Sequence, residues 1–325
     1  SLQGGALQES SLKEDNLMGM LIDGQWDPED RPRSGSGGEF IRPQSSFRAR
    51  IGDRGFPAAA GRYHLFVNAG CPWAYRTILY RALKKLESVI SLSFTRPAAG
   101  EEGWTFGETP EPILGARHLH QVYTAADPSF TGRCTVPVLW DLEEATIVNN
   151  ESSDIIRMLD AAFDDVDGVS PKRYYPDHLA AEIDGLNAWI YAEVNNGVYR
   201  CGFARTQAAY DEAFDVLFEA LDRLDARLAG QRFLCGDEIT EADWRLFATL
   251  VRFDLAYHGQ FRCNRNMLKE FEHLWPYTRD LYQQPGVADT VDVAAIRGIY
   301  YGSRPPGILP RGPLPDFLAP HQRGG

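Results

Sequence analysis

A single cysteine, Cys71, has neighbours that could make its sulfur reactive. Residues 63–67 have the composition of a short buried strand, and Pro72 follows Cys71 directly. After Pro72 the apolar residues recur at helical spacing, at positions 78, 79, 82, 83 and 86. Because proline suits the first turn of a helix, the pattern predicts that Cys71 lies where a strand passes into a helix.

This placement predicts a thiol that exchanges disulfides. The unpaired N–H groups and the positive end of the dipole at a helix N-terminus favour a thiolate, so we expect the pKa of Cys71 to be lowered. A sulfur with a low pKa leaves readily when a second thiol attacks its mixed disulfide. Ala74 stands where a Cys-x-x-Cys motif would have its second cysteine. The predicted chemistry therefore needs an outside thiol, for which glutathione is the obvious candidate.

The other cysteines and the histidines suggest no further chemistry. We expect four cysteines to be small buried apolar residues: Cys134, Cys201, Cys235 and Cys263. Five cysteines without a pairing pattern argue against a disulfide scaffold and for a reducing compartment. The 7 histidines and 5 cysteines never approach the spacing of metal ligands, so we expect no metal site.

The composition is typical of a soluble globular protein. The 325 residues are 44% hydrophobic and 24% charged, enough for two domains with a sizeable core. A net charge of −12 argues against nucleic acid or an anionic membrane surface as a partner. The sequence has neither a leader-like start nor an apolar run of about 18 residues, so we expect a cytoplasmic protein.

The two ends of the chain are predicted to lie outside the main domains. Residues 1–60 are rich in Gly, Ser, Pro and Arg, and their few apolar residues show no sustained period. We expect them to form an extended arm that Trp26 and Phe40 pin to the body. Residues 301–325 are expected to form a tail.

Residues 61–165 predict a small α/β domain. The order is strand, helix, strand, helix, strand, strand, helix, with the later strands at 90–94, 136–140 and 146–148. Pro137 lies inside a strand-like run, which indicates an edge or a special turn. The Thr-Val-Pro sequence that it ends resembles the thioredoxin-fold loop in which this proline is cis and the preceding backbone faces the active cysteine.

Glu151 and Ser152 are the second signal for chemistry. They follow the last expected strand and open a helix. A serine hydroxyl and bare N–H groups at a helix start can hold a carboxylate, and Glu151 can accept a hydrogen bond from an ammonium group. Together they suit the γ-glutamyl end of glutathione, which carries both charges. Ser152 equally fits a plain helix N-cap, and the residues alone leave both interpretations open.

After a linker at 164–171, residues 172–300 predict an all-helical domain. An apolar stripe runs along one long helix that Gly230 closes, at positions 210, 213, 217, 221, 224 and 228. Thr240 and Asp243 have the spacing of a capping box at the start of the next core helix, which is a structural role.

This order of domains resembles the glutathione transferases, whose thioredoxin-like domain is followed by an all-helical one. Gly236-Asp237 with Thr240 and Ala242-Asp243 resembles the superfamily's signature in the second domain. A cysteine, rather than serine or tyrosine, at the first helix points to the thiol-exchanging branch. Several segments resemble the glutathionyl-hydroquinone reductases, or Xi class: 38–42, 61–65, 71–74, 103–106, 131–133, 135–140, 147–153, 195–199, 251–254 and 300–303.

The resemblance implies an activity and a set of site residues. Cys71 would take glutathione from a glutathionyl-hydroquinone, and a second glutathione would reduce the mixed disulfide. The residues implied to bind glutathione are Trp104, Val136, Pro137, Glu151 and Ser152, and those implied to face the aromatic ring are Tyr199, Tyr257 and Tyr300. Judged singly, Trp104 fits a loop anchor and the tyrosines fit packing. The family also implies a homodimer formed through the helical domain.

The sequence departs from the family pattern at several positions. Gly70 replaces the usual alanine, and Tyr75 stands where histidine is common, which we expect to alter the mouth of the pocket. Residues 303–307 lack the family's Ser-His and Asn-Pro elements. Arg117 is an open candidate for a further glutathione contact.

Two other functions stay open at this point. A thioltransferase or dehydroascorbate reductase of the Omega kind would share the cysteine chemistry without the ring pocket. A non-catalytic interaction module of the same fold would not need Cys71, Pro137 and Glu151-Ser152 together.

Overall fold

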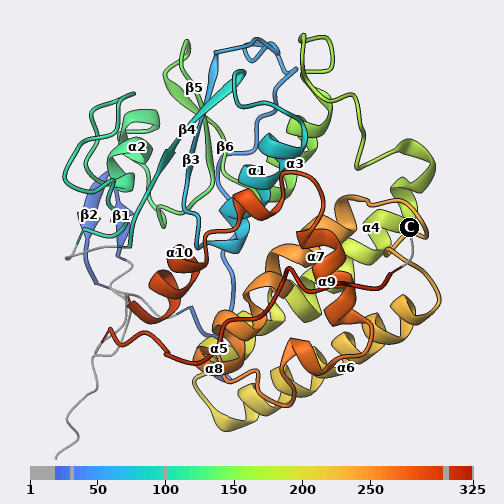
Figure 1. Cartoon of the computed structure of the whole chain (residues 1–325). Helices are drawn as coiled ribbons and strands as arrows, with labels where there is room; N and C mark the ends of the chain where they lie inside the picture. Colours follow the sequence, from blue (N-terminus) through green and yellow to red (C-terminus); the bar gives the residue numbers. More distant parts are fainter. Residues whose placement is uncertain (1–18, 30–32, 98–101, 303–306, 324–325) are drawn as a thin grey trace, which may run out of the picture.

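A four-stranded mixed sheet forms the core of the first part of the chain (Figure 1). The computed structural model describes residues 19–29, 33–97, 102–302 and 307–323. The strands are β3 (Tyr63–Val67), β4 (Ile90–Phe94), β5 (Val138–Asp141) and β6 (Thr146–Asn149). Their order is β4-β3-β5-β6, with β3 parallel to β4 and antiparallel to β5, and β5 antiparallel to β6.

Helices cover both faces of this sheet (Figure 1). They are α2 (Leu119–Ala126) on one face, and α1 (Pro72–Leu83) and α3 (Ser152–Ala161) on the other. All residues of β3 are buried because this strand has a neighbour on each side and helices above and below. The arrangement is the thioredoxin-like α/β domain that the sequence predicts.

The second part of the chain is helical, as predicted. Its α-helices are α4 (Ala180–Ile190), α5 (Gly197–Phe203), α6 (Gln207–Ala229), α7 (Glu241–Arg252), α8 (His258–Gln260), α9 (Leu274–Tyr282) and α10 (Val293–Arg297). The described residues also contain short 3₁₀ turns at Asp177–Leu179, Leu268–Glu270 and Ala288–Thr290, and π-helical turns at Tyr191–Asn195, Phe253–Tyr257 and Gly298–Gly302. Within the described ranges, no helix has both the length and the apolar character that a membrane span requires.

The apolar stripe of the long helix lies where the sequence places it. In α6 the side chains of Ala213, Leu217, Leu221, Leu224 and Leu228 are buried, and the residue that ends the helix is a glycine. Because these positions recur every three or four residues, they lie on one face of the helix. This face packs against the rest of the domain. The prediction is confirmed for these five residues, whereas Tyr210, the first position of the predicted stripe, is only half-buried.

The capping box of α7 is also confirmed, and its aspartate does more than cap the helix. The Asp243 carboxylate accepts hydrogen bonds from the Thr240 backbone N–H and hydroxyl at 2.8 and 2.9 Å. It also accepts from the Leu234 N–H and from the Tyr277 hydroxyl, both at 2.8 Å. Asp243 is fully buried, so these donors replace the water that the carboxylate would otherwise bind.

The N-terminal arm contains an unpredicted hairpin. Strands β1 (Met20–Ile22) and β2 (Gln25–Asp27) pair antiparallel across a tight turn at Asp23-Gly24. Both turn residues have positive φ, 48° and 76°, which is the conformation that Asp-Gly favours in two-residue hairpins. The Asp-Gly pair was therefore a usable signal for a hairpin at residues 20–27, which the expectation of an extended arm did not include.

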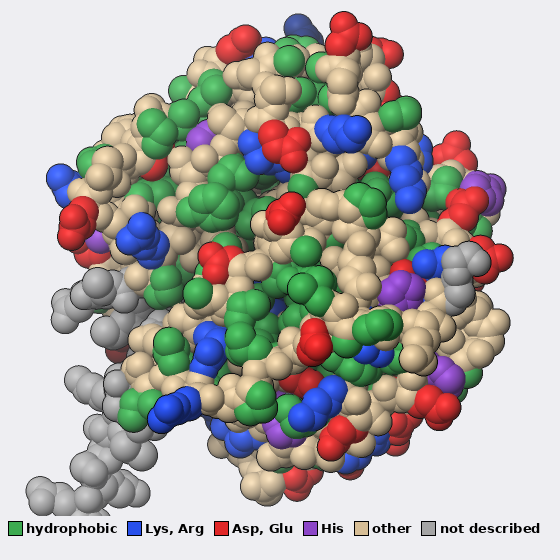
Figure 2. Space-filling view, in the orientation of Figure 1, with side chains coloured by type: hydrophobic (Ala, Val, Ile, Leu, Met, Phe, Trp, Pro, Cys, Tyr) green, Lys and Arg blue, Asp and Glu red, His purple; other side chains and the backbone are tan. Residues whose placement is uncertain are grey.

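The two expected anchors of the arm are confirmed. The ring of Trp26 stacks on His120 with their centres 4.8 Å apart. Phe40 is buried and stacks on Phe203 at 5.4 Å, which joins the arm to the helical domain. On the face shown in Figure 2, acidic and basic side chains are interspersed over the described surface.

We expect Asp243→Ala to lower the free energy of unfolding by about 3 kcal/mol or more, because it leaves several buried donors without a partner. Denaturant titration followed by circular dichroism measures this change. Asp237→Ala is the matched control, since Asp237 is an exposed acid in the loop before the same helix. Equal effects of the two substitutions would contradict the structural role of Asp243.

Candidate active site

Cys71 lies at the N-cap of α1, as predicted. Its backbone is extended, with φ −75° and ψ 124°, and Pro72 begins the helix. The side chain is 8% exposed, and its Sγ lies 4.0 Å from the carbonyl oxygen of Val136. The Val136–Pro137 peptide bond is cis. The predicted meeting of the cysteine with the backbone before a cis proline is therefore present.

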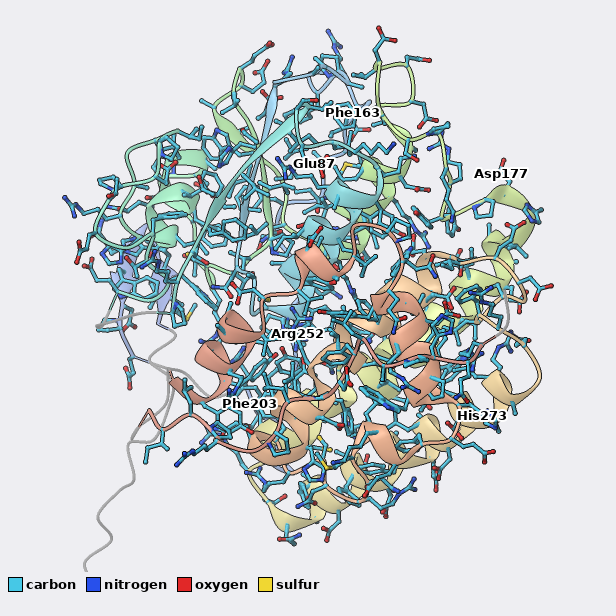
Figure 3. The ribbon with its side chains drawn as sticks, in the orientation of Figure 1. Glu87, Phe163, Asp177, Phe203, Arg252 and His273 are labelled. Atoms are coloured by element: carbon cyan, nitrogen blue, oxygen red, sulfur yellow. The ribbon has the colours of Figure 1, made fainter. Side chains whose placement is uncertain are left out.

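Arg252, on the helical domain, holds the loop that carries Cys71. Its Nε donates to the Gly70 carbonyl at 2.9 Å and its Nη2 to the Ala69 carbonyl at 3.0 Å. The remaining nitrogen, Nη1, donates to the Ala248 carbonyl within its own helix at 2.8 Å. Arg252 is completely buried, and Figure 3 shows it in the middle of the molecule between the two domains.

The expectation of a lowered pKa for Cys71 is wrong. Burial raises the pKa of the thiol above its ordinary value. The N–H groups of Ala74 and Trp73, followed by the guanidinium groups of Arg252 and Arg42, act in the opposite direction. The helix N-terminus and the cations are in place, but removal of water from the sulfur outweighs them.

The two residues of the expected carboxylate cradle have different roles at the start of α3. Glu151 is the N-cap: its carboxylate accepts from the Ser153 N–H at 3.1 Å and from the Ser45 hydroxyl at 2.9 Å. Ser152 is the first helical residue, so its interpretation as the N-cap is wrong. The buried Ser152 hydroxyl oxygen instead accepts from Arg76 Nη1 at 3.3 Å.

The three predicted ring-facing tyrosines meet in one cluster. The Tyr300 hydroxyl lies 2.9 Å from that of Tyr199 and 3.0 Å from that of Tyr257. Burial raises the pKa of each phenol, so all three are protonated at neutral pH. Each tyrosine belongs to or closely follows a π-helical turn, a feature that is frequent at functional sites.

The other sequence candidates have mixed outcomes. The indole N–H of Trp104 is buried and has no partner among the described residues, which leaves a donor for a ligand. Arg117 is exposed and donates to the Glu108 carbonyl at 3.3 Å. Tyr75 is fully buried with its hydroxyl 3.0 Å from that of Thr290, so the expectation that it alters the pocket mouth is wrong.

Sequence reasoning missed three arginines, two that act on Cys71 and one beside Ser152. They are Arg42 on the arm, Arg76 on α1 and Arg252 on α7, and their described hydrogen bonds go to amide, hydroxyl and carbonyl oxygens. Burial, and then the neighbouring Arg245, lower the pKa of Arg76 to about 9, although Glu151 and Glu241 act in the opposite direction. The available signal was an arginine within an apolar run, as at 74–79 and 250–253.

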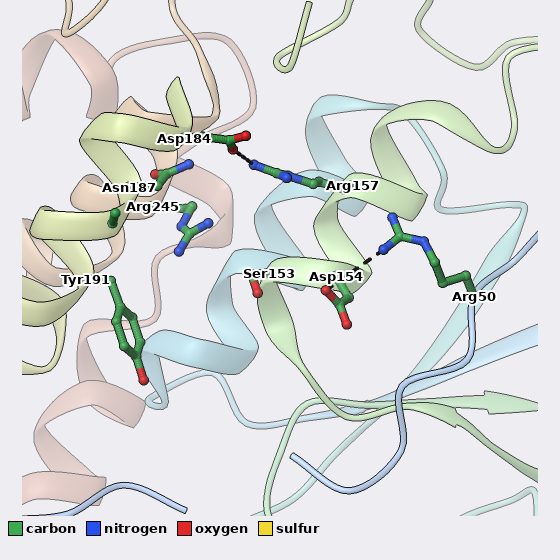
Figure 4. Close-up of a pocket in the computed structure, with 9 residues that line it drawn as sticks. Arg50, Ser153, Asp154, Arg157, Asp184, Asn187, Tyr191 and Arg245 are labelled. Carbon is green, nitrogen blue, oxygen red and sulfur yellow. Dashed lines mark hydrogen bonds and ion pairs between the residues drawn. The ribbon is translucent and has the colours of Figure 1, made fainter. Parts of the chain in front are cut away.

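In a nearby polar cleft, the arginines are paired with carboxylates (Figure 4). The cleft lies between α3 and α4, has a volume of about 370 Å³ and is lined by Arg50, Ser153, Asp154, Arg157, Asp184, Asn187, Ala188, Tyr191 and Arg245. Arg157 pairs with Asp184 at 2.5 Å, and Arg245 pairs with Glu241 at 3.2 Å. Because its cations already have carboxylate partners, this cleft has little positive charge to offer an anion. In the described residues, no group of three or more His, Cys, Asp or Glu side chains could hold a metal ion.

Gly70, a departure from the family pattern, is explained by close packing. A Cβ at this position would lie 2.5 Å from the Ala295 carbonyl oxygen and 2.6 Å from Ile299 Cγ2. Residues 295–299 run directly into the turn that carries Tyr300. The glycine therefore allows the segment with Tyr300 to approach the cysteine loop. The divergent residues 303–306 lie outside the described part of the chain.

Comparisons with known proteins first define the class. Residues 70–162 match the model of the glutathione S-transferase N-terminal domain, and residues 207–283 match that of the C-terminal domain. A Xi-class glutathione transferase from Natrialba magadii superimposes with a TM-score of 0.87 at 45% identity, covering 94% of this chain and 97% of that one. The fold is thus that of a glutathione transferase.

Two further relatives define the family within that class. Glutathionyl-hydroquinone reductase PcpF of Sphingobium chlorophenolicum is 50% identical over 304 residues, which cover 91% of this chain and 96% of PcpF. Glutathionyl-hydroquinone reductase YqjG of Escherichia coli K12 is 45% identical over 94% of this chain and 98% of its own length. The glutathione-bound structure of YqjG superimposes with a TM-score of 0.82 over 85% of this chain and 96% of that one. The chain belongs to the glutathionyl-hydroquinone reductase family, the Xi class of glutathione transferases.

The alkylation rate of Cys71 in the ligand-free protein is expected to rise with pH up to a midpoint above the ordinary cysteine pKa of about 8.5. A raised pKa leaves a smaller thiolate fraction at neutral pH, and the thiolate is the form that reacts. Iodoacetamide labelling across the neutral and alkaline range, read by peptide mass spectrometry, measures the profile. A rate that already levels off at neutral pH would mean that the pKa is lowered.

Gly70→Ala should destabilise the protein by about 1–3 kcal/mol, because the new methyl group meets backbone atoms of the neighbouring segment. Equilibrium unfolding in denaturant measures this cost. Gly298→Ala is the control, since a Cβ there has open space around it and the backbone is already helical. If Gly70→Ala is as stable as this control, the close approach is not required.

Proposed function

We propose that this protein is a glutathione-dependent reductase that removes glutathione from glutathionyl-hydroquinones. The main observation is the position of the buried Cys71 sulfur between two different surfaces. On one side it lies next to the Val136 carbonyl, before cis-Pro137. The tyrosine cluster is close enough for the charge of Cys71 to act on Tyr199. A peptide thiol and an aromatic ring thus each have a matching surface. The names of PcpF and YqjG support the same activity.

Glutathione is assigned to the sheet-domain side of Cys71. Val136 offers its backbone to the cysteinyl amide, beside Pro137. Ser152 and the bare N–H groups of α3 receive the γ-glutamyl carboxylate, and Glu151 receives the ammonium group. Because Arg76 donates to the Ser152 oxygen, the hydroxyl proton of Ser152 remains available for a bound carboxylate. The buried indole N–H of Trp104 supplies a further donor.

In the first step Cys71 attacks the sulfur of the glutathionyl-hydroquinone. A sulfur–sulfur bond forms between Cys71 and glutathione, and the bond between sulfur and ring carbon breaks. The ring carbon gains a proton, so the product is the free hydroquinone. The thiol of Cys71 loses one proton and the ring gains one, so a thiol that is protonated at rest brings the proton that the reaction consumes.

The tyrosine cluster is suited to handle that proton. Tyr199, Tyr257 and Tyr300 are protonated and share hydrogen bonds, so each can donate to the ring and be resupplied by its neighbour. If the ring takes its proton at the sulfur-bearing carbon before the carbon–sulfur bond breaks, the electron pair of that bond ends on a ring oxygen. The hydroquinone then leaves as a phenolate, which hydrogen-bond donors stabilise.

In the second step a free glutathione thiolate attacks the glutathione sulfur of the mixed disulfide. Oxidised glutathione leaves, and the sulfur of Cys71 departs as a thiolate. The N–H groups of Trp73 and Ala74 and the nearby guanidinium groups favour that leaving group. The overall change converts one conjugate and one glutathione into hydroquinone and oxidised glutathione.

The proposal also covers the cellular compartment and the oligomeric state of the enzyme. All five cysteines are free, which suits a reducing compartment, and we assign the protein to the cytoplasm. We also infer a homodimer formed through the helical domain, by resemblance to the family. Analytical ultracentrifugation of the full chain tests the dimer.

A glutathione-dependent thioltransferase of the Omega kind is the second candidate. It is supported by the glutathione S-transferase omega-like 2 of Schizosaccharomyces pombe, which is 42% identical over 300 residues. Rates on a glutathionyl-hydroquinone and on the mixed disulfide of glutathione and 2-mercaptoethanol separate the two. We expect the aromatic substrate to be preferred, and equal or faster reduction of the simple disulfide would favour the second candidate.

Cys71→Ser is expected to reduce turnover of the glutathionyl-hydroquinone by about a thousandfold or more, because the nucleophile is removed. Chromatographic detection of hydroquinone release gives the rate, and circular dichroism verifies the fold. Cys235→Ser is the matched control, because Cys235 is the half-buried cysteine of the helical domain and should keep wild-type turnover. Wild-type protein that turns over neither substrate would instead indicate a non-catalytic module.

A further inference from the structure

The N-terminal arm crosses the active site from one domain to the other. At one end the Gly38 carbonyl accepts from the Arg205 N–H in the helical domain at 3.0 Å. At the other end Ser45 donates to Glu151 in the expected glutathione cradle at 2.9 Å. Arg42 lies between these two attachments. The arm is therefore a wall of the site, and its one cation there requires a role.

The position of Arg42 is set by contacts with groups next to Cys71. Its Cζ lies 4.5 Å from the centre of the Trp73 ring and 4.7 Å from the centre of the Tyr199 ring. Its Nε donates to Asn196 Oδ1 at 2.8 Å, which fixes the plane of the guanidinium. Trp73 directly follows Pro72 in α1, and Tyr199 belongs to the tyrosine cluster. The cation thus lies against both halves of the reaction site.

Two hydrogen-bond donors, one on Arg42 and one on the neighbouring Trp73, lack an acceptor in the described part of the chain. Among the described residues, Arg42 Nη2 and Trp73 Nε1 are both buried and form no hydrogen bond. A buried donor without a partner costs about 1–3 kcal/mol, and more when it is charged. Within the described ranges, the hydrogen bond of Arg42 goes to a neutral amide, and no carboxylate pairs with its charge. These atoms are suited to an anionic oxygen that arrives with a ligand.

The surroundings of Arg42 favour the aromatic half of the substrate over the peptide half. Both Asn196 and Tyr199 belong to the helical domain, on the side assigned to the ring. The glutathione cradle has its own cation, Arg76, which already bonds Ser152. The charge of Arg42 reaches the phenol of Tyr199 as well as the sulfur of Cys71.

We propose that Arg42, together with the indole N–H of Trp73, binds an oxygen of the aromatic substrate and stabilises it as the hydroquinone leaves in its phenolate form. This inference rests on the proposed function and names the residue that recognises the leaving group. It also assigns a catalytic purpose to the arm. Loss of one preorganised donor to a developing oxyanion usually costs tenfold or more in rate.

A chromophoric phenol tests the binding without turnover. We expect 4-nitrocatechol to bind the wild-type protein as its phenolate, visible as the absorbance of the ionised form at a pH where the free compound is mostly neutral. Arg42→Gln should bind it at least about tenfold more weakly and without that absorbance. Arg42→Lys, which keeps the charge but loses the planar fork, should be intermediate.

Arg33→Gln is the matched control for this titration. Arg33 is also an arm arginine, with its Cζ 5.3 Å from the Phe40 ring and 5.5 Å from the Phe203 ring. The Arg33→Gln protein should bind 4-nitrocatechol as tightly as the wild type, and as the phenolate. Thermal unfolding of each variant establishes that the arm remains folded. Ionised binding that persists in Arg42→Gln would overturn the proposal.

Turnover supplies an independent test. For Arg42→Gln, the loss of rate with a glutathionyl-hydroquinone should exceed the loss with the mixed disulfide of glutathione and 2-mercaptoethanol by about tenfold, since the latter has no ring oxygen. Equal losses would mean that Arg42 acts on Cys71 or on glutathione and would overturn the assignment. If the wild type does not reduce the aromatic substrate, the proposed function fails, while the 4-nitrocatechol titration still decides the role of Arg42.

Discussion

Two hydrogen bonds from the buried guanidinium of Arg252 hold the loop before Cys71 against the helical domain. Arg252 binds the carbonyls of Ala69 and Gly70, directly before Cys71. Carbonyl oxygens carry only partial charges, so the cation is fixed in place without being neutralised. Its field therefore reaches the sulfur and favours the thiolate. The position and the electrostatics of Cys71 both depend on the helical domain being docked.

The candidate site differs from the protein as a whole in the sign of its charge. The protein has a net charge of −12, yet the half-buried Arg42 and the buried Arg252 lie close enough to act on Cys71, and the buried Arg76 lies beside Ser152. Within the described part of the chain, the hydrogen bonds of these three arginines go to uncharged groups. A short distance away, the guanidinium groups of the cleft in Figure 4 are matched with carboxylates. Burial of an unpaired charge is costly, so a site that tolerates several cations is suited to anionic ligands. Glutathione and a phenolate are such ligands.

The aromatic side of the site depends on irregular helices. Three π-helical turns lie at or just before Tyr199, Tyr257 and Tyr300 and bring their hydroxyl groups together. The last turn can approach the cysteine loop because Gly70 has no side chain there. A residue that looks like a minor departure from the family pattern is thus a packing requirement. The arm, with Arg42, closes the remaining side.

Local patterns in the sequence were sufficient for much of the fold. The strand–Cys71–proline–helix order, the Asp243 cap and the apolar stripe of α6 depend on interactions within a few residues, and each was predicted. The Asp23-Gly24 turn carried an equally local signal that was overlooked. The resemblance to a known family supplied the tyrosines, which spacing alone could not distinguish from packing residues. The residues themselves supplied no reason for three positions so far apart to meet.

The sequence by itself determined which sulfur is the candidate nucleophile and which helix presents it, because a strand, a cysteine and a proline in succession permit few other arrangements. Only the tertiary structure decided the ionisation of that atom. Burial by distant segments raises the pKa of Cys71 and outweighs the N–H groups of Ala74 and Trp73 in its own helix, which lower it together with Arg252 from α7 and Arg42 from the arm. Desolvation and charge act through space, so they are defined only once distant segments have packed together.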